Sequence, residues 1–193
     1  MAASTDDWIV IGVSGVTCGG KTMLSKALHD RYAGLSRVIM QDSYFLPESS
    51  DRHVRVEGMT HFNWDCLGAL DMDRMRTDVN DALTSPPPSP HRKGVLLLDG
   101  FLLFVDPCLS QLCKRKYFFT LPQAACRKRR DARVYDPPDV PGYFEACVWP
   151  EYERSKRLAM QMNSDICFLD GQLPIDQHLT MVCEDIDKLL HQN

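Results

Sequence analysis

The sequence contains no apolar run long enough to cross a membrane, and Asp6 and Asp7 stand where a secretory signal would be basic. We therefore expect no membrane association and a cytoplasmic location. Positive charge is not in excess either, because 22 lysines and arginines face 26 aspartates and glutamates. Since binding to a nucleic-acid backbone depends on basic residues, this balance argues against a nucleic-acid partner and favours a small molecule.

Paired cysteine motifs are also missing. The eight cysteines are dispersed without a C-x-x-C pair, and the six histidines do not cluster with them at the spacing of zinc ligands. We expect reduced, buried thiols and no zinc. A length of 193 residues and a hydrophobic content of 44% predict a single domain, residues 1–193, with a sizeable core. We expect a monomer.

One motif near the start points to chemistry. It fits the phosphate-loop pattern G-x-x-x-x-G-K-[ST], in which backbone amides, a lysine and a hydroxyl surround the phosphates of a nucleotide. Lys21 would contact the terminal phosphates, and the Thr22 hydroxyl would be a magnesium ligand. The motif therefore predicts binding of ATP or GTP with magnesium. Its residues are Gly15, Val16, Thr17, Cys18, Gly19, Gly20, Lys21 and Thr22.

The segments around the loop support this interpretation. The apolar run 8–13 before it is typical of a buried parallel strand, and residues 23–32 after it have helical spacing, with Gly34 as the stop. Further strands are predicted at 37–40, 95–98, 117–121 and 166–169. Strands that alternate with helices predict an α/β phosphate-loop NTPase fold, a five-stranded parallel sheet flanked by helices with a small helical lid.

The helices are predicted from apolar spacing and from prolines. One helix should start at Asp65 and end before the proline tract 86–90, and another should follow Pro122 and carry the basic run 127–133. A packing helix is expected over 175–189, and residues 48–62 should form an exposed loop.

Two aspartates follow strands directly, at the sheet edge where such folds bind ligands. Asp99 has the form of the second nucleotide-binding motif, whose carboxylate helps to hold the metal, although an aspartate that caps a turn would look the same. Asp42 could accept the proton of a hydroxyl that attacks the γ-phosphate, or it could satisfy local amides. Placement alone leaves both alternatives open.

The basic run is the third candidate. On a helix, Arg129 and Arg133 would share one face, with Arg130 close by, and such a face can close over phosphates. A solvated surface is the commoner role of such a run. The proline-rich turn that follows suits a hinge, so we expect a lid over residues 127–150.

At these residues the sequence resembles the nicotinamide riboside kinases, a branch of the uridine kinase-like phosphate-loop enzymes. The resemblance covers nearly the whole length, and its lid cluster is more specific than the phosphate loop. The residues are Gly12-Val13-Ser14-Gly15-Val16-Thr17 up to Lys21-Thr22, Gln41-Asp42 before an aromatic pair, Asp65 after an aromatic, Asp99-Gly100-Phe101-Leu102-Leu103-Phe104, Arg133-Val134-Tyr135 with Pro137-Pro138-Asp139, Pro141-Gly142-Tyr143-Phe144, Val148-Trp149-Pro150 and Leu169-Asp170-Gly171.

The resemblance implies a role for each site residue. Asp42 would be the base and, with Thr22 and Asp99, a magnesium ligand. Asp65 and Arg130 would hold the ribose hydroxyls, and Trp64 would stack on the pyridine ring. Without the resemblance, Asp65 would be a helix N-cap and Trp64 a packing residue. The other implied contacts are Ser43, Tyr44, Phe45 and Tyr135 for the nucleoside, and Met23, Arg129 and Arg133 for ATP.

Three positions depart from the family pattern. Asp99 stands where the animal kinases carry glutamate, Ser43 replaces an acidic neighbour of Asp42, and Trp64 stands where tyrosine is usual. The first shortens the reach to a metal. The other two could shift preference between the amide, the acid and pyrimidine nucleosides.

The sequence therefore predicts an ATP-dependent kinase that phosphorylates the 5'-hydroxyl of nicotinamide riboside, and of nicotinic acid riboside, in NAD biosynthesis. Uridine or cytidine kinase is the alternative, with the same fold and metal chemistry. A small GTPase would need an N-K-x-D element, which the sequence does not contain. A non-catalytic nucleotide-binding module would be expected to lose the acceptor-side residues Asp42, Asp65 and Arg130.

Overall fold

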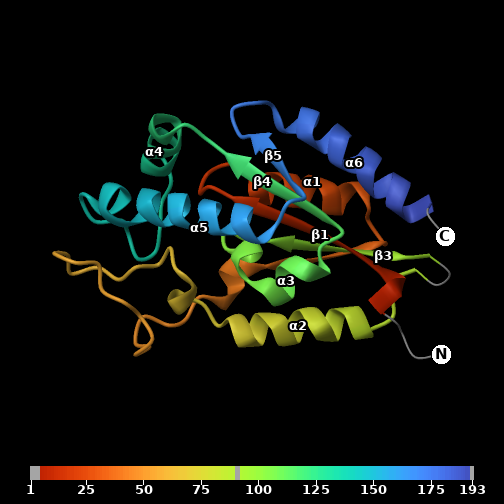
Figure 1. The fold of residues 1–193 in the computed structure, drawn as a ribbon, viewed down its shortest axis with the longest axis horizontal. Coiled ribbons are helices and arrows are strands. Elements are labelled where there is room, and N and C mark those ends of the chain that lie inside the picture. Colours follow the sequence, from red (N-terminus) through yellow and green to blue (C-terminus); the bar gives the residue numbers. More distant parts are fainter. Residues whose placement is uncertain (1–4, 90–91, 192–193) are drawn as a thin grey trace.

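The computed structural model describes residues 5–89 and 92–191, which form one parallel sheet with helices on both faces (Figure 1). The strands lie in the order β2-β3-β1-β4-β5, and every neighbouring pair is parallel. This arrangement confirms the predicted fold class. The strands are β1 (Trp8–Gly15), β2 (Ser36–Met40), β3 (Gly94–Asp99), β4 (Arg115–Thr120) and β5 (Ile166–Asp170).

Two apolar cores sandwich the sheet. Every residue of β1 and β3 is buried, as the central strands of a sheet covered on both faces require. Helices α1 (Lys21–Arg31) and α6 (Ile175–His191) cover one face, with Leu24, Leu28 and Val182 in the core. The other face is covered by α2 (Met72–Thr84), α3 (Pro107–Leu112) and α5 (Trp149–Met162).

The carboxyl ends of β1, β2 and β3 meet at one edge of the sheet, because the strands are parallel neighbours. Beyond this edge lie α4 (Gln123–Asp131), a π-helical turn (Phe144–Val148) and the loop over residues 47–66 (Figure 1). Any side chain at the end of these three strands therefore faces the space that α4 and the loop border.

The predicted helix start at Asp65 is wrong. Helix α2 begins at Met72, and its N-cap is Asp71, whose carboxylate accepts from Arg74 N at 3.2 Å. The preceding segment is held by other partners: Leu46 N donates to Ala69 O, and Asp71 N donates to the carbonyl of Tyr44. These bonds tie residues 69–71 to the segment after β2. Asp65 therefore lies outside the helix, in the segment that precedes it.

The basic run is only partly helical. Helix α4 ends at Asp131 with Ala132 as its C-cap, so Arg133 lies beyond the helix and does not share a helical face with Arg129. Helices α3 and α5 were not predicted; both carry a proline in the first turn, where the missing amide hydrogen costs nothing. Of the proline tract, Pro90 lies outside the described residues.

The burial of the cysteines differs from the expectation. All eight cysteines are free, yet only Cys113, Cys126 and Cys147 are buried, and Cys108 is exposed. Among residues 5–89 and 92–191, no helix has both the length and the apolar character that crossing a membrane would need.

A glycine after β3 allows two turns to pack closely. A Cβ built at Gly100 would lie 2.5 Å from Gln41 Cβ, and Gln41 is fully buried, so it has nowhere to move. We expect Gly100→Ala to lower the free energy of unfolding by about 1–3 kcal/mol, as overpacking does. Thermal unfolding measures this effect. Gly68→Ala is the matched control, because its Cβ would meet its nearest atoms at 3.5 Å. Equal melting temperatures for the two variants would contradict the prediction.

Candidate active site

The phosphate loop connects β1 to α1 in a conformation that depends on glycine. Gly15 has a φ of 116°, and a Cβ there would lie 2.2 Å from the carbonyl oxygen of Phe119. That carbonyl accepts from Val16 N at 3.0 Å, which anchors the loop to β4. Gly20, with a φ of 112°, is the N-cap of α1, so Lys21 and Thr22 open the first turn of the helix. The helix N-terminus therefore points into the loop, where anions bind.

Two cavities meet at this loop. The first has a volume of about 440 Å³ and lies between the loop, the ends of β2 and β3, and the lid; the second, of about 530 Å³, lies between the loop, α4 and the turn after β5. Both are lined by Cys18, Lys21, Thr22 and Arg133. Groups bound in the two cavities would therefore meet beside these four residues, which include the phosphate-loop lysine and threonine.

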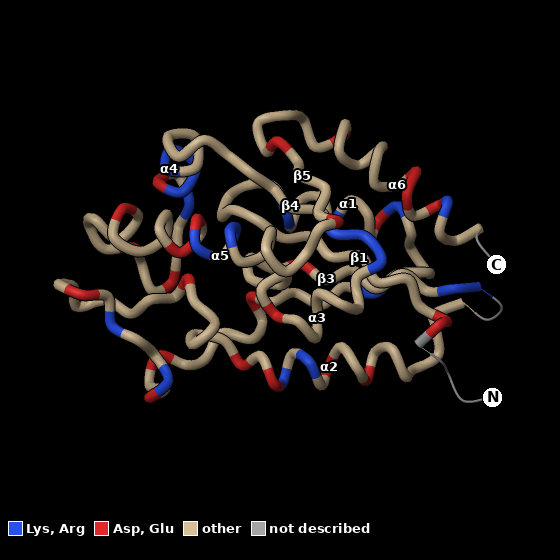
Figure 2. Tube along the Cα trace, viewed as in Figure 1, with Lys and Arg blue, Asp and Glu red and all other residues tan. Residues whose placement is uncertain are grey.

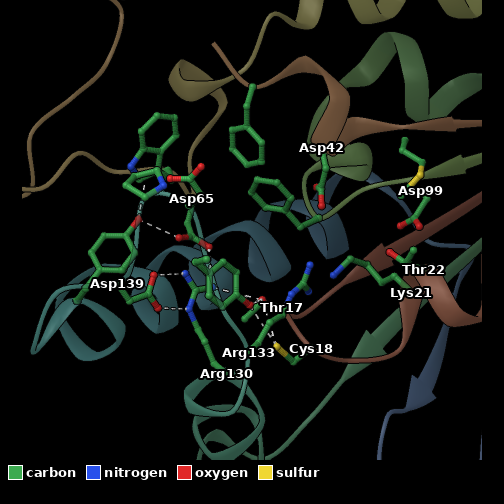
Figure 3. Close-up of a pocket in the computed structure, with 18 of the residues that line it drawn as sticks. Thr17, Cys18, Lys21, Thr22, Asp42, Asp65, Asp99, Arg130, Arg133 and Asp139 are labelled. Carbon is green, nitrogen blue, oxygen red and sulfur yellow. Dashed lines mark hydrogen bonds and ion pairs between the residues drawn. The ribbon is translucent and has the colours of Figure 1, made fainter. Parts of the chain in front are cut away.

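One end of the first cavity gathers opposite charges. Lys21, Thr22, Asp42 and Asp99 lie together there (Figure 3). Burial lowers the pKa of Lys21, while the charges of Asp99 and Asp42 oppose this shift. Burial likewise raises the pKa of Asp99, and Lys21 opposes it. Lys21 Nζ donates to Val16 O at 2.8 Å.

Asp42 reaches this end because a buried glutamine holds its turn. Gln41 Oε1 accepts from Leu102 N at 2.9 Å, which joins the turn after β2 to the turn after β3. Gly100 leaves room for that contact. Asp42, next in the chain, is exposed and lines the cavity. The two aspartates predicted at neighbouring strand ends are thus brought together.

The opposite end of the cavity is built around Arg130. Its guanidinium donates two hydrogen bonds to Asp139, at 2.6 and 3.0 Å, and a third to Thr17 Oγ1 at 3.3 Å. Asp65 Oδ1 lies 3.8 Å from Arg130 Nη1, and Asp65 Oδ2 accepts from the Tyr143 hydroxyl at 3.0 Å. Figure 3 shows Asp65, Arg130 and Asp139 at this end, away from Lys21. A carboxylate and a guanidinium are therefore fixed side by side.

Aromatic rings form the wall beside this pair. Phe45 lies edge-on to Trp64 with centroids 5.9 Å apart and is stacked on Phe101 at 6.0 Å, and all three rings line the cavity. Trp64 is also backed by His53 at 4.4 Å. Trp64 is thus both a packing residue and a cavity residue.

The segment 127–150, which was predicted as a lid, contacts the phosphate loop directly. Tyr135 Oη lies 3.3 Å from both Thr17 Oγ1 and Cys18 Sγ, and Arg129 Nη1 donates to Cys18 O at 3.1 Å. The guanidinium carbon of Arg130 lies 4.3 Å from the Tyr135 ring centroid. Figure 2 shows that α4 carries a group of basic residues, whereas both signs of charge are mixed over most of the chain.

Most of the predicted site residues line one of the two cavities, and four do not. Ser43 is exposed outside both, and Tyr44 is buried with its hydroxyl donating to Asp78 at 2.8 Å, so the expected nucleoside contacts of these two have no counterpart in the cavity lining. The other two are Gly15 and Val16, which begin the phosphate loop and line neither of the two cavities. The first cavity is lined by Thr17, Cys18, Lys21, Thr22, Asp42, Phe45, Trp64, Asp65, Asp99, Arg130, Arg133 and Tyr135, and the second by Cys18, Gly19, Gly20, Lys21, Thr22, Met23, Arg129 and Arg133.

Several cavity residues were not predicted. Asp139 holds Arg130, and Tyr143 holds Asp65. The other unpredicted residues that line the first cavity are Met40, Leu46, Glu48, Phe101, Asp136 and Pro137. Asp139 and Tyr143 do belong to the lid motifs that carry the family resemblance, which was the available signal. Glu48 and Asp136 had no signal, because no local pattern shows which exposed carboxylates of a loop turn towards a cavity.

The fold and site together define a phosphate-loop kinase. Among solved structures, a sugar kinase from Janibacter sp. has a TM-score of 0.56 at 16% identity and covers 93% of this chain and 95% of its own. A gluconokinase from Sinorhizobium meliloti has a TM-score of 0.54 at 13% identity, over 95% of this chain and 94% of its own. At these identities the likeness shows the fold.

Curated relatives narrow the class. Nicotinamide riboside kinase 1 of Rattus norvegicus is 38% identical over 191 residues, 95% of this chain and 96% of that protein. Nicotinamide riboside kinase 2 of Mus musculus is 34% identical over 193 residues, 94% of this chain and 97% of that protein. A uridine kinase of Bacillus thuringiensis is 28% identical and covers 59% of this chain. No family model matches the sequence. The chain belongs to the nicotinamide riboside kinase family, which confirms the resemblance seen in its motifs.

Proposed function

We propose that the protein transfers the γ-phosphoryl group of ATP to the 5'-hydroxyl of nicotinamide riboside, giving the mononucleotide used to make NAD. Nicotinic acid riboside is the expected second substrate. One observation carries the proposal: a single cavity has the phosphate-loop lysine at one end and a carboxylate, guanidinium and tryptophan at the other. The names of the relatives support the same acceptor.

The acceptor end suits a ribosyl pyridinium. A vicinal diol donates to a carboxylate and accepts from a guanidinium, and Asp65 and Arg130 present these two groups 3.8 Å apart. A cationic ring is favoured over the face of an aromatic side chain, which Trp64 offers. We place the ribose on Asp65 and Arg130 and the ring against Trp64, which directs the 5'-carbon towards Asp42.

The chemical step needs orientation more than a strong base. The 5'-oxygen forms a bond to the γ-phosphorus while the bond from that phosphorus to the β,γ-bridging oxygen breaks, and ADP leaves. Asp42 takes the proton of the 5'-hydroxyl. Lys21 neutralises charge on the transferring group, which has a loose transition state. Arg129 and Arg133 hold the ATP phosphates from the lid side, where both line the second cavity.

The residues around Thr22 fit magnesium. Asp99 Oδ2 is buried and accepts no hydrogen bond within the described part of the chain. The described part of the chain contains no group of three His, Cys, Asp or Glu side chains that could hold a metal by themselves. Such a group is not needed for magnesium in kinases, because the ion is held by one or two carboxylates together with the phosphates of the nucleotide. We propose Thr22, Asp42 and Asp99 as its protein contacts. Bound magnesium would neutralise the triphosphate and polarise its γ-phosphoryl group.

A coupled assay of ADP release tests the proposal. Nicotinamide riboside, nicotinic acid riboside, uridine and cytidine are compared at equal concentration with ATP and magnesium. We expect the highest kcat/KM with a riboside of the pyridine type. A preference for uridine or cytidine would make the protein a pyrimidine nucleoside kinase. ADP release with none of the four would support a non-catalytic module, and isothermal titration of nucleoside with a non-hydrolysable ATP analogue would show whether it still binds both.

The state of Asp65 predicts a pH dependence. Burial raises the pKa of Asp65 above the ordinary carboxyl value, although the charge of Arg130 opposes this shift. Since the ionised carboxylate binds the diol, kcat/KM for the riboside should fall as the pH is lowered through this raised pKa. Measured from pH 4.5 to 8, the Asp65→Asn variant should lack this acid limb. An identical acid limb in that variant would assign the titration to another group.

A further inference from the structure

The first cavity is lined by more negative than positive side chains. Six carboxylates face three cations there: Asp42, Glu48, Asp65, Asp99, Asp136 and Asp139 against Lys21, Arg130 and Arg133. An excess of acidic groups is unexpected in a site that must also receive a triphosphate. Any carboxylate that neither the metal nor a neighbouring cation accounts for has to be explained by the other ligand.

Four of the carboxylates are accounted for by neighbouring cations. Asp42 and Asp99 lie with Lys21, where their charges oppose the lowering of the Lys21 pKa by burial. Asp139 is hydrogen-bonded twice to Arg130, and Asp65 is 3.8 Å from the same guanidinium. These four are used in binding the phosphates, the metal and the ribose.

The remaining two, Glu48 and Asp136, have no such use. Neither makes a hydrogen bond or an ion pair in the part of the chain that the structure describes. Both are exposed, so water solvates them until a ligand fills the cavity. They come from separate elements: Glu48 lies three residues after the cavity residue Phe45, and Asp136 follows Tyr135 in the lid.

Both positions line the first cavity, and each is connected through chain neighbours to a residue of the acceptor end. Pro47, which precedes Glu48, accepts a hydrogen bond from His53 through its carbonyl oxygen, and His53 packs on Trp64 with centroids 4.4 Å apart. Asp136 follows Tyr135 in the chain, and the ring centroid of Tyr135 lies 4.3 Å from the guanidinium carbon of Arg130. Two segments that reach the acceptor end, one through His53 and Trp64 and the other through Tyr135 and Arg130, therefore each carry an unpaired carboxylate on the wall of this cavity.

We infer that Glu48 and Asp136 set the charge preference of the acceptor site, which favours a cationic N-ribosyl pyridinium amide over its acid counterpart and over uncharged pyrimidine nucleosides. This inference rests on the proposed function. The amide riboside carries a net positive charge on its ring. The acid riboside adds a carboxylate to the same ring, which two further carboxylates repel. A ligand that excludes water from the cavity strengthens this discrimination, because the local dielectric falls.

The test compares ratios of kcat/KM for nicotinamide riboside, nicotinic acid riboside and uridine. We expect Asp136→Asn and Glu48→Gln each to lower the amide-to-acid ratio by about three- to ten-fold, the size of a single partly exposed charge interaction, and the double variant to lower it further. Raising the salt concentration should compress the ratio of the unmodified enzyme. Asp51→Asn and Glu57→Gln are matched controls, since both are exposed in the loop after Glu48 and line neither cavity.

Binding constants provide the second readout. Isothermal titration of each riboside, without ATP, gives the same ratio even for a variant with impaired turnover. If the amide-to-acid ratios of kcat/KM and of the binding constants in the double variant stay within two-fold of those of the unmodified enzyme, the inference is wrong while the proposed function stands. If the unmodified enzyme phosphorylates neither riboside, the proposed function fails and the inference fails with it.

Discussion

Replacing Asp42 by asparagine is expected to lower kcat for riboside phosphorylation by about 10³-fold, within the range of a positioned general base. Asparagine keeps the shape of the side chain but cannot take the proton of the 5'-hydroxyl. Because Asp42 is exposed in the cavity and Gln41 holds its turn from the buried side, the fold should be unaffected. ATP binding, measured by titration with a non-hydrolysable analogue, should stay within a few-fold of normal, since removing one proposed metal contact leaves the phosphate loop intact.

The control for this variant is Asp51→Asn, which removes an exposed aspartate from the loop that follows and lines neither cavity. Its kcat should equal that of the unmodified enzyme. A kcat for Asp42→Asn within ten-fold of normal would remove Asp42 from the chemistry. A large loss of ATP affinity would instead show that Asp42 acts mainly through the metal.

The parts of the site that could be predicted from the sequence are those that follow strands. Lys21, Asp42 and Asp99 each come shortly after a run of apolar residues, and the topology of a parallel sheet brings the ends of such runs to one edge. The observed order places β3 between β1 and β2. Local pattern and a general rule of topology were enough to bring these three side chains together.

The acceptor end could not be found in this way. Asp65 reads as a helix N-cap because a polar residue precedes an amphipathic helix, yet the helix starts at Met72. Bonds from Leu46 to Ala69 and from Asp71 to Tyr44 decide that start, and they join segments more than twenty residues apart. The pairing of Arg130 with Asp139 likewise depends on how the lid folds back on α4. Such long-range contacts have no local signal, and only the family resemblance indicated a role for Asp65 and Arg130.

The arginine run is a second case in which local sequence did not predict the structure. A helix that follows Pro122 and continues through Arg133 was predicted, but the helix ends at Asp131. Arg133 nevertheless lines both cavities, because the chain turns back towards the phosphate loop beyond the helix. The functional expectation for Arg133 therefore stays a proposal, although the geometry from which it was argued is wrong.

Replacing Lys21 by methionine should have an effect as large as that of Asp42→Asn, but on a different step. Methionine fills a similar volume without the charge, so the phosphate loop can keep its conformation while the transferring phosphoryl group loses a donor. Removal of one such electrostatic contact in a closed site costs about 10²–10³-fold in rate. Because Lys21 also faces Asp42 and Asp99, its loss leaves two carboxylates that repel the triphosphate, and we expect a kcat/KM for ATP lowered by about 10³-fold.

The matched control is Lys26→Met, which removes an exposed lysine from the same helix. It should leave kcat/KM unchanged. Lys21→Arg should restore little activity, because the bulkier planar guanidinium cannot replace a compact ammonium that donates to Val16 O at 2.8 Å. Riboside affinity, by contrast, should survive in Lys21→Met, since Asp65, Arg130 and Trp64 lie at the other end of the cavity. Parallel loss of ATP and riboside binding would show that the two ends of the cavity are not independent, and that Lys21 organises the whole site.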